Sequence, residues 1–219
     1  SPPLFLGMTA MLLARAKGAK LVFNVSDLWP ESAVQLGLVT NRTAIRISTW
    51  LEELCYRRAS LITGQTMGIV QNIAERCPDR TVLWLPNGVD LEAIGAAEGT
   101  ISPVEARKGL GIAPGHLVIT YAGILGHAQG LEVVVQAAAL LKDRTDIHFL
   151  LIGDGPEKVM LQTLKAELST DQVRFVDRMP RAELLGLLRG TDAVVIPLRR
   201  NDLFKGAIPS KIFEALALG

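Results

Sequence analysis

The sequence predicts an α/β protein made of two Rossmann-like domains, both of which we expect to be truncated in this chain. Short apolar runs rich in β-branched residues alternate with segments of helical periodicity, and this alternation restarts after a polar stretch at residues 93–103. The strands of the second half are nearly continuous apolar runs, as in parallel sheets that are covered on both faces. We therefore place one domain at residues 1–98 and a second at 99–219, with 93–103 as the linker.

The predicted elements of the first half alternate regularly. Residues 20–29, 61–66 and 81–90 are predicted as strands that each end in a turn, and residues 41–60 and 67–77 as helices. Three strands are fewer than the five or six that a doubly wound domain usually has, so we expect part of this domain to be missing. The apolar run Leu4–Ala14 is too short to span a membrane and is predicted to be a buried helix.

The second half has the same alternation with longer apolar strands. Its predicted elements are strands at 116–123, 147–155, 172–179 and 192–199, helices at 130–142, 156–168 and 180–189, and a last helix that opens at Pro209. No strand follows that last helix, so we expect the end of this domain to be missing as well.

Composition excludes several classes of protein. The 219 residues carry a formal net charge of +1, which gives no electrostatic case for nucleic acid as a partner. Cys55 and Cys77 have neither the spacing nor the flanking histidines of a metal site, so we expect buried, reduced thiols.

Ligands of open α/β sheets bind beyond the carboxyl ends of the strands, and four stretches of this chain lie there. In the first of them, YAGILGHAQG, Gly123, Gly126 and Gly130 allow sharp turns and close backbone approach, and a helix N-terminus follows that can hold an anion. The spacing is not that of a dinucleotide fingerprint, and no acidic residue stands about 20 residues further on, which disfavours a nicotinamide cofactor. The second stretch, IGDGP at 152–156, is interpreted as a tight turn between strand and helix.

The other two stretches carry charged side chains. In DLWPES, Asp27 could orient or deprotonate a hydroxyl, or could simply cap the helix that follows. In the closing stretch, Lys211 and Glu214 share a helix face. They could form a surface ion pair of little value. Alternatively, the lysine would bind a diphosphate and the glutamate the two hydroxyls of a ribose.

Five stretches, taken in order, resemble one enzyme family. DLWPES, PNGVD, YAGILGHAQGL, IGDGPEK and IPSKIFEALALG resemble the retaining GT-B glycosyltransferases of family 4, in particular the bacterial fucosamine-transferase-like enzymes of surface polysaccharide assembly. The resemblance covers nearly the whole chain. It implies that 1–98 is the latter part of the acceptor-binding domain and 99–219 the nucleotide-sugar-binding domain without its C-terminal end.

The resemblance also implies roles for single residues. Glu214 matches the second glutamate of the E-x7-E motif, which holds the donor ribose, whereas the first glutamate falls at Gly206. In the phosphate-binding element, Ile124 and Gln129 stand where the family has an arginine and a lysine. The lost charge would then be supplied by Lys211, with Arg199 as a further candidate.

Two more roles follow from the resemblance. Asp27 matches an acceptor-side polar residue and is the candidate catalytic residue, while the backbone of residues 173–184 would read the base. The implied donor-binding residues are Gly123, Gly126, Gln129, Val176, Arg199, Lys211 and Glu214.

The sequence is thus interpreted as part of a retaining glycosyltransferase, one that moves an N-acetylated amino sugar from a UDP-sugar to a lipid-linked saccharide. We expect no metal or other cofactor and a cytoplasmic location. Arginines on the 41–58 helix, beside Trp50 and Tyr56, could contact the inner membrane face or form a solvated surface. Two alternatives remain: a UDP-sugar 2-epimerase, for which His127 is the best-placed histidine, and a non-catalytic nucleotide-sugar-binding protein.

Overall fold

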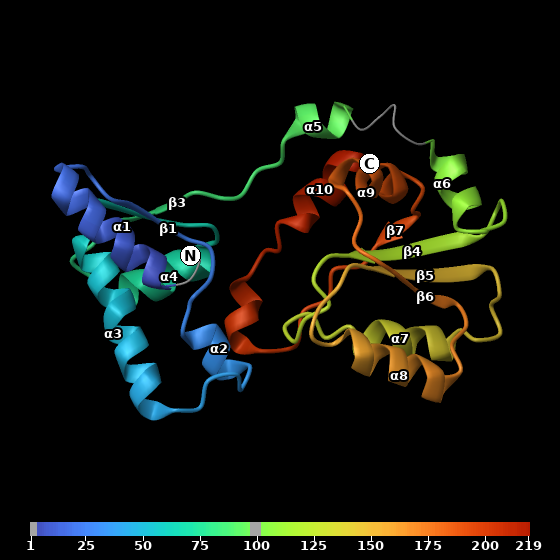
Figure 1. Ribbon diagram of the computed structural model, residues 1–219, viewed down its shortest axis with the longest axis horizontal. Helices are drawn as coiled ribbons and strands as arrows, with labels where there is room; N and C mark the ends of the chain where they lie inside the picture. Colours follow the sequence, from blue (N-terminus) through green and yellow to red (C-terminus); the bar gives the residue numbers. More distant parts are fainter. Residues whose placement is uncertain (1–3, 97–101) are drawn as a thin grey trace. The chain divides into compact units, whose positions relative to one another are not determined.

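The computed structural model describes residues 4–96 and 102–219, and its contacts divide the chain into two compact units. The first comprises Ser1–Asn87 with Arg200–Ile208, and the second Gly88–Arg199 with Pro209–Gly219. Each unit contains one parallel sheet (Figure 1). The predicted boundary between residues 98 and 99 and the centre of the predicted linker lie outside the described residues.

The first unit is built on a parallel sheet of three strands in the order β1-β2-β3. Asn41 caps α3 and Thr66 caps α4, since each side chain accepts hydrogen bonds from backbone N–H groups of the first helical turn. The elements of this unit are α1 (Leu4–Lys17), β1 (Val22–Val25), α2 (Glu31–Gln35), α3 (Arg42–Arg58), β2 (Leu61–Gly64), α4 (Met67–Arg76), β3 (Val82–Trp84) and the 3-10 helix η2 (Asp202–Gly206).

Apolar side chains of β1, β2, α3 and α4 form the core of this unit, and both cysteines lie in it. Cys55 and Cys77 are buried and free, as predicted. The prediction of a buried N-terminal helix was wrong for most of α1, where only Leu4 and Gly7 are buried. The helix meets α3 and β1 along one narrow side, at Gly7, where an added Cβ would come within 2.8 Å of Phe23. The opposite side of α1 is exposed.

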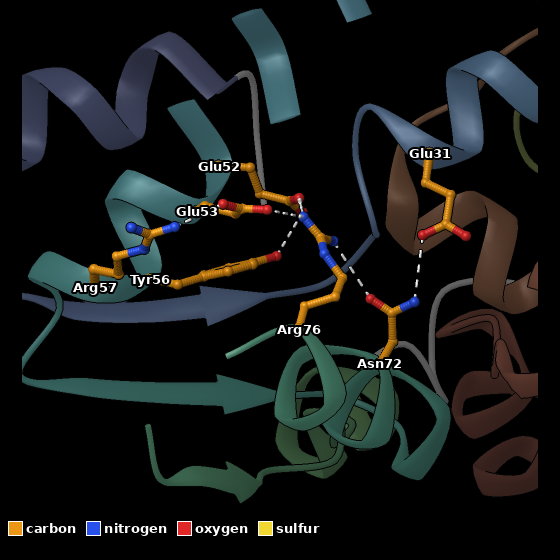
Figure 2. Close-up of polar contacts among 7 residues, drawn as sticks. All are labelled: Glu31, Glu52, Glu53, Tyr56, Arg57, Asn72 and Arg76. Atoms are coloured by element: carbon orange, nitrogen blue, oxygen red, sulfur yellow. Dashed lines mark hydrogen bonds and ion pairs between the residues drawn. The ribbon is translucent and has the colours of Figure 1, made fainter. Parts of the chain in front are cut away.

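A buried polar network joins α3 to α4 (Figure 2). Glu52 accepts a hydrogen bond from the Tyr56 hydroxyl at 2.5 Å and forms an ion pair with Arg76. Burial raises the pKa of the Glu52 carboxyl, although Tyr56 and Arg76 oppose that rise. Tyr56 therefore belongs neither to a membrane-contacting face nor to a solvated face of this helix, the two alternatives that the sequence left open, because this side chain is fully buried against Glu52.

The second unit has four parallel strands in the order β6-β5-β4-β7. Two helices, α5 and α6, occupy the described parts of the stretch predicted as a linker, with Ser102 and Glu105 forming a capping box for α6. The elements are α5 (Leu91–Ala96), α6 (Pro103–Gly109), β4 (Leu117–Ala122), α7 (Glu132–Leu140), β5 (Ile147–Ile152), α8 (Lys158–Leu168), β6 (Val173–Val176), α9 (Arg181–Arg189), β7 (Ala193–Val194) and α10 (Lys211–Leu218).

The sheet of this unit lies between two layers of helices, so β5, one of its two inner strands, is buried at every position. Helices α7 and α8 lie on one side of the sheet and α9 on the other (Figure 1). Phe149 and Leu151 pack with α7 and α8, whereas Leu150 and Ile152 pack with Leu187 of α9. The interpretation of strands with both faces covered is therefore confirmed for β5. The strand predicted at 192–199 is much shorter in the structure, where β7 consists of Ala193–Val194.

Two strand-to-helix turns pack against each other at the carboxyl edge of this sheet. Gly153 has a φ of +135°, and a Cβ there would overlap the Gly123 carbonyl oxygen. A Cβ on Gly155 would likewise overlap the Leu125 backbone. The IGDGP stretch is thus a tight structural turn, as interpreted from sequence, and it supports the glycine-rich loop after β4.

Candidate functional site

A pocket of about 360 Å³ lies within the second unit, at the carboxyl end of β4 and the start of α10. Parallel sheets of this kind bind ligands at that edge, beyond the ends of the strands. The pocket is lined by Ala122, Gly123, Ile124, Gln129, Leu184, Leu188, Val194, Ser210, Lys211, Glu214 and Ala215. Four predicted donor-binding residues are therefore brought together here: Gly123, Gln129, Lys211 and Glu214.

Lys211 is the first residue of α10 and carries its ammonium into the pocket wall. Its Nζ donates a hydrogen bond of 2.9 Å to the Tyr121 hydroxyl and lies 4.1 Å from the centroid of the Tyr121 ring. Burial lowers the pKa of Lys211 to about 8, and the nearby Glu214 carboxylate only partly opposes that shift. An anion entering the pocket would therefore meet a poorly solvated cation.

Gly123 leaves the space that this ammonium occupies. Its φ is +145°, and a Cβ there would overlap the Lys211 Nζ. Gln129 folds over the same loop, with its Oε1 3.0 Å from the position that a Cβ on Gly126 would take. Of these residues only Lys211 carries a positive charge, and Ile124 presents an exposed apolar side chain.

Glu214 lies one turn further along α10. Its Oε1 accepts a hydrogen bond of 2.8 Å from the Arg181 guanidinium of α9. The surface pair with Lys211 that the sequence left open is thus replaced by a half-exposed pair with Arg181. Lys211 and Glu214, the two candidate residues of this helix in the sequence analysis, both line the pocket. The helix begins at Lys211, whereas the sequence predicted a start at Pro209.

Three other predicted donor-binding residues do not line this pocket. Gly126 is buried beneath Gln129, and the Val176 carbonyl accepts the Gly153 N–H at 2.9 Å. Arg199 donates a hydrogen bond to Glu157 at 3.2 Å and forms an ion pair with Glu132 at 3.1 Å. Two carboxylates thus share the guanidinium, so a role for Arg199 as diphosphate cation stays a prediction that this geometry does not favour.

A second charged cluster forms behind the glycine-rich loop. The buried Glu157 carboxylate contacts both His127 Nδ1, at 2.8 Å, and Arg199. Its Oε2 has no hydrogen-bond partner among the described residues. Sequence reasoning missed this cluster because His127, Glu157 and Arg199 lie in three separate stretches of the chain, and no local pattern indicates that these stretches meet.

Asp27 belongs to the first unit, in the turn that leads into α2. Its Oδ2 accepts a hydrogen bond of 3.0 Å from the Ser32 hydroxyl, and the residue is exposed. The N-cap of α2 is Pro30, and no side chain caps the backbone there, so Asp27 does not act as a helix cap in the simple sense.

Gly206, where the resemblance would place the first motif glutamate, lies against Gly68 of α4. A Cβ on Gly206 would come within 3.1 Å of the Gly68 Cα. The close approach of these two backbones explains a glycine at this position.

Residues 104–219 match the family model of "Glycosyl transferases group 1". The chain belongs to this family. It is 24% identical over its whole length to the putative colanic acid biosynthesis glycosyl transferase WcaI of Escherichia coli K12, of which it covers 54%. It is 28% identical, over 98% of its length, to the probable glycosyltransferase WbjE of Pseudomonas aeruginosa, of which it covers 53%. This glycosyltransferase chain thus spans about half the length of these relatives.

Solved structures show the same fold. Anabaena HepE in complex with UDP and glucose superposes on this chain with a TM-score of 0.74 at 17% sequence identity. The match covers 99% of this chain and 55% of the HepE chain. WaaG, a glycosyltransferase involved in lipopolysaccharide biosynthesis, superposes with a TM-score of 0.67 at 18% sequence identity. The match covers 90% of this chain and 54% of the WaaG chain. The two parallel sheets of this glycosyltransferase chain therefore resemble those of the two GT-B halves. The narrower fucosamine-transferase branch is not distinguished by these matches.

No group of at least three His, Cys, Asp or Glu side chains in 4–96 and 102–219 is arranged to hold a metal ion. None of the helices in those same ranges is both long and apolar enough to cross a membrane.

Proposed function

We propose that this chain is part of a retaining glycosyltransferase that uses a nucleotide-sugar donor. The main support for this proposal is the half-buried ammonium of Lys211, which lies in a pocket at the carboxyl edge of a parallel sheet. The chain that holds this pocket belongs to a glycosyltransferase family. A diphosphate in this pocket would gain both the charge of Lys211 and the N-terminal end of α10. This arrangement stabilises the leaving diphosphate while the bond to the sugar breaks.

The proposal assigns the residues as follows. Lys211 binds the diphosphate, and the glycine-rich loop with Gly123, Gly126 and Gln129 allows the donor to come close to the backbone. Glu214 accepts hydrogen bonds from the ribose hydroxyls, and the segment that contains Val176 contacts the base. Residues 99–219 form the donor-binding domain under this proposal.

On the acceptor side, residues 1–98 belong to the acceptor-binding domain, and Asp27 orients or deprotonates the acceptor hydroxyl. Asp27 is exposed and its Oδ2 accepts from Ser32 within its own turn, so its Oδ1 can accept from an incoming hydroxyl. We further propose that the acceptor is a lipid-linked saccharide of surface polysaccharide synthesis and that the protein works in the cytoplasm. The likeness to WcaI, named as a putative colanic acid biosynthesis glycosyl transferase, supports the link to polysaccharide synthesis.

The donor we propose is a UDP-linked N-acetylated amino sugar. UDP is supported by the likeness to HepE, whose structures hold UDP, UDP with glucose, and UDP-glucose. The amino sugar rests on the resemblance of the quoted motifs to fucosamine-transferase-like enzymes.

A donor screen with the intact protein tests the proposal. UDP-sugars with and without an N-acetyl group are incubated with lipid-linked saccharide acceptors, and products are identified by mass spectrometry. Extension of the acceptor by one sugar, with release of UDP, is the expected result. Interconversion of the UDP-sugar without acceptor would instead indicate the 2-epimerase, and tight UDP-sugar binding without any turnover would indicate a binding protein.

A further inference from the structure

The hydroxyl of Tyr121 joins two parts of the pocket. It donates a hydrogen bond of 2.6 Å to the Ile124 carbonyl oxygen, and it accepts one of 2.9 Å from the Lys211 ammonium. Ile124 belongs to the glycine-rich loop, whereas Lys211 begins α10. One hydroxyl therefore couples the loop to the cation, although the two are far apart in the chain.

This arrangement limits the freedom of a flexible side chain. A lysine has four rotatable bonds, and an ammonium without partners can take many positions at little cost. Here the Tyr121 ring lies under the ammonium at 4.1 Å, the hydroxyl bonds it from the ring's edge, and Gly123 leaves room for it. Among the described residues, the titratable groups that face Lys211 are the neutral Tyr121 hydroxyl on β4 and the Glu214 carboxylate on α10, and Glu214 is itself paired with Arg181 of α9.

The tyrosine itself is held rigidly. Its side chain is fully buried in the core that β4 shares with α7 and α8, so the ring cannot follow the lysine. Because the core holds the Tyr121 ring in place, whereas a lysine side chain is intrinsically flexible, the tyrosine determines where the ammonium lies.

We propose that Tyr121 is a positioning residue that fixes the Lys211 ammonium against the glycine-rich loop, in the place where the donor diphosphate binds. This inference rests on the proposed function, because it takes Lys211 as the cation for the diphosphate. Tyr121 contributes through Lys211 and touches no reacting atom. Fixing the cation before the donor arrives lowers the entropy lost on binding.

The matched variants are Tyr121→Phe, which keeps the ring and removes only the hydroxyl, and Lys211→Met, which keeps the stem and removes the charge. Affinities for UDP and uridine are measured calorimetrically for wild type, each single variant and the double variant. We expect Tyr121→Phe to weaken UDP binding about fivefold or more, the scale of one hydrogen bond, and to change uridine binding by less than about twofold. In the Lys211→Met background, Tyr121→Phe should change neither affinity.

A second readout needs no nucleotide. The lysines are labelled by reductive ¹³C-methylation, the Lys211 signal is assigned with Lys211→Arg, and its titration is followed by NMR. Removal of the hydroxyl takes away an acceptor of the charged form, so Tyr121→Phe should lower the pKa of Lys211 below its wild-type value. A purely structural role in the core would lower thermal stability without moving this titration.

The outcomes separate the two proposals. An unchanged Lys211 titration in Tyr121→Phe, or equal losses of UDP affinity in both backgrounds, would overturn the positioning role while leaving the donor site in place. A wild-type protein that binds UDP no better than uridine would overturn the diphosphate site, and the positioning role would fall with it.

Discussion

The Glu214 carboxylate accepts a hydrogen bond from the Arg181 guanidinium at 2.8 Å, so it is paired across to α9 and not with the lysine on its own helix. Both members of this pair are partly exposed, and such a pair contributes little to stability. The pair nevertheless orients the carboxylate on the pocket wall, where a ribose would need two hydrogen-bond acceptors.

Substitution of Glu214 by glutamine tests the ribose assignment. The amide replaces one acceptor with a donor that would face a hydroxyl, so UDP should bind at least about tenfold more weakly. The variant should also discriminate less than wild type between UDP and 2′-deoxy-UDP. Arg181→Gln is the matched control, because it removes the ion pair and keeps the carboxylate. Equal discrimination in Glu214→Gln and wild type would rule out the ribose contact.

Lys211 should couple UDP binding to proton uptake. The pKa of Lys211 is about 8 in the folded protein, below the ordinary lysine value of 10.5. Between these two pH values, Lys211 holds fewer protons in the folded protein than in the unfolded chain. Its contribution to the free energy of unfolding therefore rises with pH in this range. A bound diphosphate favours the charged amine and raises this pKa. At about pH 9, calorimetry in two buffers of different ionisation enthalpy should therefore show proton uptake in wild type. Lys211→Ala should show none.

The same variant measures what the charge contributes to affinity. Lys211→Ala should weaken UDP binding by about 1.5–3 kcal/mol, the value of a hydrogen bond to a charged group. Uridine, which lacks the diphosphate, should bind as it does to wild type. If both ligands weaken alike, the lysine does not contact phosphate.

Gly123→Ala should displace the lysine without removing it. The alanine methyl would overlap the Lys211 Nζ, and the backbone φ of +145° is unfavourable for any residue with a Cβ. We expect a loss of UDP affinity larger than the loss for uridine, with destabilisation of about 1 kcal/mol or more from the backbone strain. Gly115→Ala is the control, because its φ of +84° gives a similar backbone strain, nothing lies within 4 Å of its added Cβ, and it does not line the pocket. Similar losses in the two variants would contradict the specific contact at Gly123.

Asp27→Asn should lower turnover far more than donor affinity. The asparagine can still accept from the Ser32 hydroxyl, so the turn should keep its shape, while the negative charge is lost. Steady-state kinetics at several donor concentrations gives both quantities, and Ser32→Ala controls for the turn itself. Turnover that stays at the wild-type level would reduce Asp27 to a structural residue.

Arg76→Met should destabilise the first unit strongly. It would leave the Glu52 carboxylate buried without its cation, which costs about 3–5 kcal/mol in comparable buried pairs. Loss of Arg76 raises the pKa of Glu52 further, so the folded state takes up its proton more readily and the deficit should shrink as the pH falls. Denaturant unfolding of Arg76→Met and of the double variant with Glu52→Gln, at acid and neutral pH, measures this. A deficit in Arg76→Met that does not depend on pH would exclude an unpaired carboxylate as its cause.

Most of the secondary structure could be read from local patterns. The parallel strands β1 to β6, the helices α3, α4 and α7 to α9, and the tight turn at Gly153 follow from periodicity and turn residues, which act over a few positions. The short helices α2, α5 and α6 did not emerge, because a few residues carry too little periodic signal. The exposure of α1 was not predicted either, because an apolar composition does not show how much of a helix surface other elements cover.

By itself, the sequence determined the α/β class, the order of the strands along the chain and the presence of a lysine and a glutamate on one face of the last helix. Tertiary structure alone decided the partners of those charges. Tyr121 with Lys211, Arg181 with Glu214, and Glu157 with His127 and Arg199 are separated by 30 to 90 positions in the chain. Contacts between residues so far apart depend on how helices and strands pack against one another, and packing leaves no local pattern in the sequence.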